Sequence, residues 1–310
     1  MNFYKIIKVI FLLFLSVIFG AIISYKEKEK DKKKSININP YYSKDLNEKL
    51  LFMRHGKTDF NAAINQANRR VNPLYIDSKL ILKGINQAKS KQNILNSLSL
   101  EKVYVSPFYR ALQTLTFALQ NHPNKNNIIA LVHPLVGEIT SCVNDYILDI
   151  KQTKKDFNLN STIKIDWSLF DEYIKWIKYD ENFYYFDNFD NFDEKEKNKI
   201  YFKLKNFYDK GNIKQLKIGL TELSKLRFKK KKRFESLMHA QNRFKKFIDY
   251  IKQIHKKTMQ NKEEKILVFS HGAFMKVATN LAPYKSKLIE KLNSNCYAPK
   301  NCEILSYKIK

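Results

Sequence analysis

The chain has 310 residues, of which 44% are hydrophobic, and its 57 Lys and Arg against 30 Asp and Glu give a formal net charge of +27. This length and apolar content allow one large domain or two small ones, and they exclude a protein that is disordered overall. Only seven of the cations are Arg. The charge is therefore either a solvated lysine background or an attraction to polyanions, and by itself it names no partner. Three Cys without a CxxC pair, and six scattered His, give neither a metal-ligand spacing nor a disulfide framework.

The N-terminal region is expected to interact with a membrane. Residues 9–24 are uncharged, and with the apolar residues just before them they make about 28 Å of helix, just enough to span a bilayer. Residues 1–25 are therefore either a single-pass anchor or a cleaved signal peptide. Residues 26–47 form a polar, Lys-rich linker that only weakly favours a cytoplasmic body. The expected location is a membrane or the secretory pathway, with the side of the membrane left open.

Residues 48–310 read as one α/β domain. Apolar runs of strand length occur at residues 49–54, 102–107, 127–134, 266–269 and 303–309. Segments with helical spacing occur at residues 80–98, 108–119, 234–257 and after Gly272. The alternation predicts three layers, with a doubly wound, mostly parallel sheet flanked by helices. A helical or irregular insertion is expected at about residues 146–233.

Two of the predicted strands end in the same unusual way. The segments LLFMRHG (50–56) and ILVFSHG (266–272) each close a buried strand with a histidine and a glycine. The carboxyl ends of parallel strands meet at one edge of a sheet, so His55 and His271 are expected to lie together there. Arg110, just past the next strand, is expected to join them. Two imidazoles and two guanidinium groups would repel one another unless an anion lay between them, which predicts a phosphate site.

The residue types at this edge suit a phosphoryl group. Arg54 and Arg110 offer planar, bidentate donors to phosphoryl oxygens. Gly56 and Gly272 are expected to let the backbone come close to the anion, and the helix after Gly272 to point its positive end at it. Asn61 is either a further phosphoryl ligand or an ordinary loop residue.

The motifs resemble those of the histidine phosphatase superfamily, whose members include phosphoglycerate mutase and many phosphomonoesterases. The resemblance covers most of the chain from residue 48 onward, apart from the insertion. It is carried in order by RHGKTDFN (54–61), DSKLILKGINQAKS (77–90), VSPFYRALQT (105–114) and VFSHGAFMK (268–276). Lys57 departs from the family, which more often has Glu, Gln or Ala after the glycine.

The resemblance implies a reaction that also makes sense from the residues. Neutral imidazole is a competent nucleophile near neutral pH, so His55 would attack phosphorus and form a phosphohistidine. Arg54, Arg110 and His271 would stabilise the charge that spreads over the phosphoryl oxygens. No metal and no other cofactor is expected.

A proton donor must stand opposite the nucleophile, because a leaving alkoxide needs a proton. The family places its acid after the third strand, where this chain has Glu138; Asp145 and Glu172 are the alternatives. The aromatic residues of the insertion either build a cap over the pocket or belong to an added subdomain without substrate contact. The basic run Lys229–Arg233 is either a solvated loop or a contact for anionic lipid or nucleic acid.

The sequence therefore predicts a metal-independent phosphomonoesterase. Its substrate is a phosphorylated small molecule or a phosphoprotein, and no nucleic-acid partner is expected. Two alternatives remain open. One is a catalytically silent relative that binds phosphate or polyanions, and the other is a mutase-type phosphotransferase.

Overall fold

The computed structural model describes residues 42–230, 233–278 and 298–309. At its centre is a seven-stranded sheet in the order β1-β7-β2-β6-β3-β4-β5. The strands are β1 (Tyr42–Ser43), β2 (Leu50–Arg54), β3 (Ser99–Val105), β4 (Ile129–Val132), β5 (Lys164–Asp166), β6 (Glu264–Ser270) and β7 (Ile304–Tyr307). The five strands from β2 to β5 in this order are parallel, and β7 and β1 are antiparallel additions at one side.

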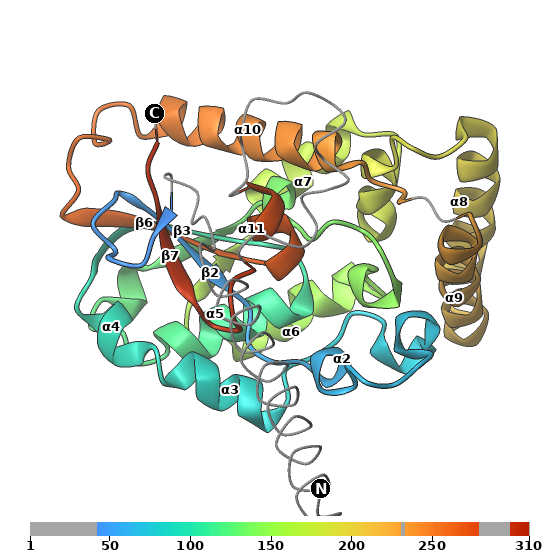
Figure 1. The fold of residues 1–310 in the computed structure, drawn as a ribbon, viewed down its shortest axis with the longest axis horizontal. Coiled ribbons are helices and arrows are strands. Elements are labelled where there is room, and N and C mark those ends of the chain that lie inside the picture. The colour runs from blue at the N-terminus through green and yellow to red at the C-terminus, as the bar shows by residue number, and fades with distance from the viewer. Residues whose placement is uncertain (1–41, 231–232, 279–297, 310) are drawn as a thin grey trace, which may run out of the picture.

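Helices cover both faces of the sheet (Figure 1). The α-helices are α2 (Asp59–Ala62), α3 (Leu82–Lys89), α4 (Gln92–Asn96), α5 (Tyr109–Leu119), α6 (Ile150–Asn160), α7 (Ser168–Trp176), α8 (Glu194–Asp209), α9 (Ile213–Lys229), α10 (Leu237–Ile254) and α11 (Gly272–Ala278). Short 3-10 helices are η1 (Arg69–Val71), η2 (Pro73–Tyr75), η3 (Lys125–Asn127), η4 (Pro134–Val136), η5 (Val143–Asp145) and η6 (Glu181–Asn188). Figure 1 shows α3, α4, α5 and α6 on one side of the sheet and α10 and α11 on the other. The predicted three-layer, mostly parallel fold is confirmed.

Strand β2 shows why both faces must be covered. Its side chains alternate between two apolar clusters, as the period of a strand requires. Leu51 and Met53 belong to the cluster under α5, whereas Leu50 and Phe52 belong to the cluster under α10. All four side chains are fully buried. This is the continuous apolar run expected of a central parallel strand.

The element boundaries differ from the sequence expectations at three places. The helix expected over residues 80–98 is two helices, α3 and α4. Strand β1 lies inside the predicted linker 26–47, because it pairs with β7. Strand β5 lies inside the predicted insertion 146–233 and extends the sheet beside β4. Both strands have three residues or fewer, which is too short for a recognisable apolar pattern.

A group of aromatic residues in the insertion belongs to the core, whereas Trp176 and Phe202 are exposed. Phe183, Tyr184, Tyr185, Phe186 and Phe189 are each at most 2% exposed and belong to the larger apolar cluster. Their rings pack on one another in tilted and edge-on pairs. These side chains therefore hold the added helices to the sheet and do not build a cap.

The predicted membrane location is not supported. Across the described ranges, no helix is long and apolar enough to cross a bilayer. A spanning helix needs about 20 predominantly apolar residues, whereas α10, with 18 residues, has one buried and one solvent-facing side. The segment on which the prediction rested, residues 1–25, lies outside the described residues. We therefore correct the prediction, and neither an anchor, a signal segment nor a membrane or secretory location is retained.

Candidate active site

Parallel pairing of β2 with β6 brings the two histidine motifs together. Arg54 pairs in register with Ser270, so the residues that follow them leave the sheet side by side. The His55 backbone N–H donates to the Ser270 carbonyl at 3.0 Å. The imidazole rings of His55 and His271 lie with their centroids 5.3 Å apart. Residues more than 200 positions apart thus share one sheet edge, as the sequence predicted.

His55 is held in a single neutral tautomer. Its Nδ1 lies 2.7 Å from the Gly56 carbonyl oxygen. A carbonyl only accepts, so Nδ1 carries the proton and Nε2 keeps its lone pair. Burial, together with the guanidinium groups of Arg110 and Arg54, holds the pKa of His55 well below its usual value. His55 is therefore an unprotonated nitrogen base at neutral pH.

His271 is neutral for the same reasons, but both of its nitrogens are engaged. Arg110 Nε donates to His271 Nδ1 at 3.2 Å, and His271 Nε2 lies 2.7 Å from the Ser106 hydroxyl oxygen. Nδ1 accepts, so Nε2 carries the proton. The edge of the Phe108 ring packs on the His271 imidazole, with centroids 5.1 Å apart. Burial and nearby positive charge, chiefly that of Arg110, lower the pKa of His271 well below its usual value.

Arg110 is a fully buried cation with fixed partners. It donates from Nη1 to the Asn144 carbonyl at 2.6 Å, and its Nη2 pairs with Asp145 Oδ1 at 3.4 Å. Its guanidinium carbon also lies 4.6 Å from the centroid of the Phe108 ring. The charge repulsion expected at this edge is therefore relieved in two ways: the two imidazoles are neutral and one guanidinium is paired with a carboxylate.

Arg54 presents an unused donor. Its Nη1 donates to the Pro299 carbonyl at 2.7 Å, but its buried Nε has no hydrogen-bond partner among the described residues. A Cβ on Gly272 would lie 2.7 Å from this Nε and 2.8 Å from the guanidinium carbon. Gly272 is therefore needed for the position of Arg54. An unpaired buried donor is costly. Arg54 lines the pocket, and an acceptor bound there would satisfy this donor.

Gly56 and Asn61 shape the loop after β2. A Cβ on Gly56 would lie 2.6 Å from the carbonyl oxygen of Gly84 in α3, so this glycine allows close packing of two backbones. Asn61 Oδ1 accepts from the Thr58 backbone N–H at 3.3 Å and from Asn301 Nδ2 at 3.4 Å. Its own amide nitrogen remains a donor at the pocket wall.

Glu138 occupies the N-terminus of α11. Its Oε1 accepts from the backbone N–H groups of Ile139 at 3.0 Å and Phe274 at 2.8 Å, and its Oε2 accepts from Ala273 at 3.4 Å. The helix end that was expected to face the anion is thus taken by this carboxylate. Burial and the neighbouring Asp145 raise the pKa of Glu138, although Arg110 and the N–H donors oppose the shift.

The other two acids considered as proton donors are placed differently. Asp145 lines the same pocket, but its oxygens already accept from Arg110, Ser141, Cys142 and Asn144. Glu172 lines a different pocket beside His133. Glu138 is the acid that lines the main pocket without a basic side chain bound to it.

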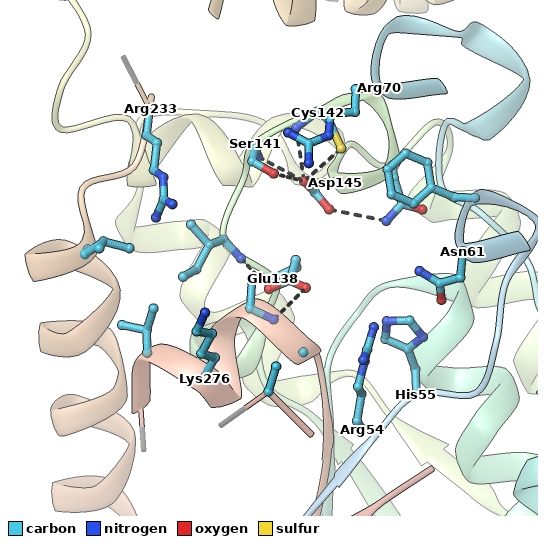
Figure 2. Close-up of a pocket in the computed structure, with 18 of the residues that line it drawn as sticks. Arg54, His55, Asn61, Arg70, Glu138, Ser141, Cys142, Asp145, Arg233 and Lys276 are labelled. Carbon is cyan, nitrogen blue, oxygen red and sulfur yellow. Dashed lines mark hydrogen bonds between the residues drawn. The ribbon is translucent and has the colours of Figure 1, made fainter. Parts of the chain in front are cut away.

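The pocket beside these residues has a volume of about 430 Å³ and is strongly basic (Figure 2). Arg54, His55, Asn61, Glu138 and Gly272 line it. Arg110 and His271 lie behind this wall, with no exposed surface. Four further arginines line the pocket: Arg69, Arg70, Arg227 and Arg233. Of these, only Arg233 was considered from the sequence, as part of the basic run Lys229–Arg233. The sequence could have indicated these arginines, because arginine is scarce in this lysine-rich chain.

In the part of the chain that the structure describes, no three His, Cys, Asp or Glu side chains are grouped as metal ligands. Cys142 and Cys302, the two described cysteines, are buried and unpaired with each other. Cys296 lies outside the described residues. Metal independence of the reaction stays a prediction for experiment.

Sequence comparison finds a family match over part of the chain. Residues 50–130 match the model of the histidine phosphatase superfamily (branch 1). A probable phosphatase of Schizosaccharomyces pombe is 30% identical over 115 residues, which is 36% of this chain and 51% of that protein. The match therefore spans about half the length of this curated relative. Together the two matches confirm the resemblance that the motifs indicated.

Solved structures with a related arrangement were also found. A mycobacterial glucosyl-3-phosphoglycerate phosphatase is 11% identical, with 82% of this chain and 87% of that chain covered and a TM-score of 0.42. The alpha-ribazole phosphatase of Shigella flexneri is 12% identical, with 84% and 94% covered and a TM-score of 0.42. A phosphoserine phosphatase of Entamoeba histolytica is 17% identical, with 84% and 93% covered and a TM-score of 0.38.

Proposed function

We propose that this member of the histidine phosphatase superfamily is a phosphomonoesterase that carries the phosphoryl group on His55. The observation that supports this most directly is the tautomer of His55. Its Nδ1 proton is held by the Gly56 carbonyl, so the Nε2 lone pair is available in a pocket lined by Arg54 and Glu138. Uncharged imidazole needs no further base to act as a nucleophile.

In the proposed reaction, His55 Nε2 attacks phosphorus as the bond from phosphorus to the ester oxygen breaks. Glu138 gives its proton to the departing oxygen, so an alcohol leaves and a phosphohistidine remains. A water molecule then attacks the phosphohistidine, Glu138 takes up a proton from this water, and inorganic phosphate leaves. The raised pKa of Glu138 suits the first step, because part of the population stays protonated above the usual range of a carboxyl group.

The arginines supply the electrostatic stabilisation. The free Nε of Arg54 donates to a phosphoryl oxygen, which relieves its unpaired state. Arg110 acts from beneath as a desolvated positive charge that Asn144 and Asp145 hold in place. His271, bonded to Arg110, fixes the direction of that guanidinium.

Hydrolysis of para-nitrophenyl phosphate by the full chain, with a metal chelator present, tests this function. Wild-type protein should release phosphate, and His55→Ala should lower kcat by at least about a thousandfold, because the reaction loses its nucleophile. The control His239→Ala removes an imidazole that lines another pocket and should keep the activity. Rapid quenching with radiolabelled substrate should trap an acid-labile, alkali-stable phosphoenzyme in wild type but not in His55→Ala. Full activity in His55→Ala, or activity that the chelator abolishes, would refute the mechanism.

A further inference from the structure

The basic wall of the pocket carries more positive charge than one phosphate group needs. Five of the seven arginines in the chain line it, together with Lys276. Among the described residues, the carboxylates on the same wall are those of Glu138 and Asp145. A phosphomonoester bound beside Arg54 carries at most two negative charges. Within the described part of the chain, four arginines therefore remain without an anion after the reacting phosphate is bound.

These four arginines form a group of their own, here called the outer arginine group: Arg69, Arg70, Arg227 and Arg233. Arg70 and Arg227 share one aromatic surface, with their guanidinium carbons 5.9 Å and 4.5 Å from the centroid of the Phe228 ring. Arg69 lies over Phe60 at 4.8 Å. Within the described ranges, none of the four forms an ion pair with an acidic side chain.

Some N–H donors of the outer arginine group have no hydrogen-bond partner among the described residues. Arg227 Nε is buried and has no hydrogen-bond partner in the described part of the chain. Arg69 donates to the Phe60 carbonyl at 3.3 Å, which uses one of its five N–H groups. Burial lowers the pKa of the Arg227 guanidinium, and repulsion by Arg233 and Arg70 lowers it further. Close, unpaired guanidinium groups are costly unless an anion binds between them.

The insertion contributes two of the four arginines of this group, Arg227 and Arg233. Helix α9 belongs to the insertion and packs against η1 and η5, so its end carries Arg227 to the side of Arg69 and Arg70. Figure 2 shows Arg233 entering the pocket from the side opposite His55 and Arg54, with Glu138 between them. Substrate parts that lie beyond the reacting ester would reach the outer arginine group.

We propose that the outer arginine group is a second phosphate site and that the preferred substrate is a small molecule with two phosphate groups. This proposal builds on the proposed function, with one phosphate beside His55 and the other beside Arg227 and Arg233. Planar guanidinium forks bind phosphate oxygens in pairs, and several of them together match a dianion. A pocket of about 430 Å³ is in the range of small-molecule sites. The insertion thus selects the substrate through cations, while a group of its aromatic residues fills the core.

Calorimetry with the full-length His55→Ala protein tests this site without turnover. The probes are α,ω-alkanediol bisphosphates of two to eight carbons, the matching alkyl monophosphates, and ω-phosphoalkanoic acids that carry a carboxylate at the far end. At one or more chain lengths, the bisphosphate should bind at least tenfold more tightly than the monophosphate, because charge-assisted hydrogen bonds are added. The carboxylate analogue should gain less than threefold.

Two double variants in the insertion, made in the same His55→Ala protein, locate the effect. Arg227→Gln with Arg233→Gln should abolish the advantage of the bisphosphate and leave the affinity for the monophosphate within twofold. Lys225→Gln with Lys229→Gln removes the same charge from exposed positions of α9 and should leave both affinities within twofold. If the first pair also weakens monophosphate binding, Arg70→Gln, at an exposed position, replaces it and should lower the bisphosphate advantage at least threefold.

Each outcome bears on the proposal. No bisphosphate advantage at any chain length, or an advantage that survives the arginine variants, overturns it. An equal gain with the carboxylate overturns the assignment of the second group as phosphate. If wild-type protein hydrolyses no phosphomonoester while the bisphosphate advantage is present, the proposed function fails and the second phosphate site stands.

Discussion

Replacing Glu138 with Gln should remove the proposed proton donor and leave the fold almost unchanged. The amide oxygen of Gln can still accept from the backbone N–H groups of Ile139 and Phe274, which are the two shorter of the three hydrogen bonds. Only the 3.4 Å bond from Ala273 is lost, so the free energy of unfolding should fall by no more than about 1 kcal/mol. The acidic proton is lost altogether. A positioned acid contributes about 10²- to 10⁴-fold, or about 3–5 kcal/mol of transition-state stabilisation.

The assay compares two substrates that differ in their need for this proton. With an alkyl phosphate, Glu138→Gln should lower kcat about 10²- to 10⁴-fold, because an alkoxide is a poor leaving group. With para-nitrophenyl phosphate the loss should stay below about tenfold, because nitrophenolate leaves without a proton. Similar losses on both substrates, or a loss below threefold on the alkyl phosphate, would show that Glu138 is not the proton donor.

The pH profile gives a second readout of the same step. Glu138 acts as an acid only while it is protonated, so the wild-type rate with the alkyl phosphate should fall as the pH rises through its pKa. Burial and Asp145 raise that pKa, so the fall should come above the usual range of a carboxyl group. His55 must be unprotonated, and its lowered pKa places the acid limb below about pH 6.5. The alkaline limb should disappear in Glu138→Gln.

Two further predictions concern Gly272 and His133. A Cβ in Gly272→Ala would overlap the Arg54 guanidinium group, and this should lower kcat/KM for para-nitrophenyl phosphate at least about tenfold. The thermal midpoint should change little, since the end of a flexible side chain can move. Unchanged kinetics would show that the position of Arg54 does not matter. Burial lowers the pKa of His133 to about 3. Between about pH 6.5 and pH 3, the folded protein therefore binds one proton fewer at this residue than the unfolded chain does. As the pH falls through this range, this group should decrease the free energy of unfolding by up to about 1.4 kcal/mol per pH unit. Denaturant titrations at pH 7, 6 and 5 should show a shallower decrease for His133→Asn than for wild type, and equal slopes would contradict the assigned shift.

The sequence by itself determined which strands bring the two histidines to one edge of the sheet. Two apolar runs that each end in a histidine and a glycine predict parallel strands with both histidines at one sheet edge, and the register of β2 on β6 confirms this meeting. The reason is local: the apolar pattern of five to seven residues already specifies a central strand, and parallel pairing then fixes where its end lies. The same local patterns gave Arg54 and Arg110 their places near the histidines.

Only the tertiary structure decided the protonation of the site. The Gly56 carbonyl sets the tautomer of His55, and burial beside two guanidinium groups keeps both imidazoles neutral. The N-terminus of α11, which sequence patterns assigned to the anion, is bound by Glu138. These are contacts between residues far apart in the chain, and no periodicity within a segment encodes them.

The insertion shows most clearly how local sequence patterns and tertiary packing determine different features. Its aromatic residues left open a cap or an added subdomain without substrate contact, and packing buried Phe183, Phe186 and Phe189 in the core, because burying apolar area is favourable. Arg227 and Arg233 line the pocket. The membrane location rested on the hydropathy of residues 1–25 alone, and no helix in the described ranges is long and apolar enough to cross a bilayer. Local patterns thus determined which elements form, and packing decided which side chains face the substrate.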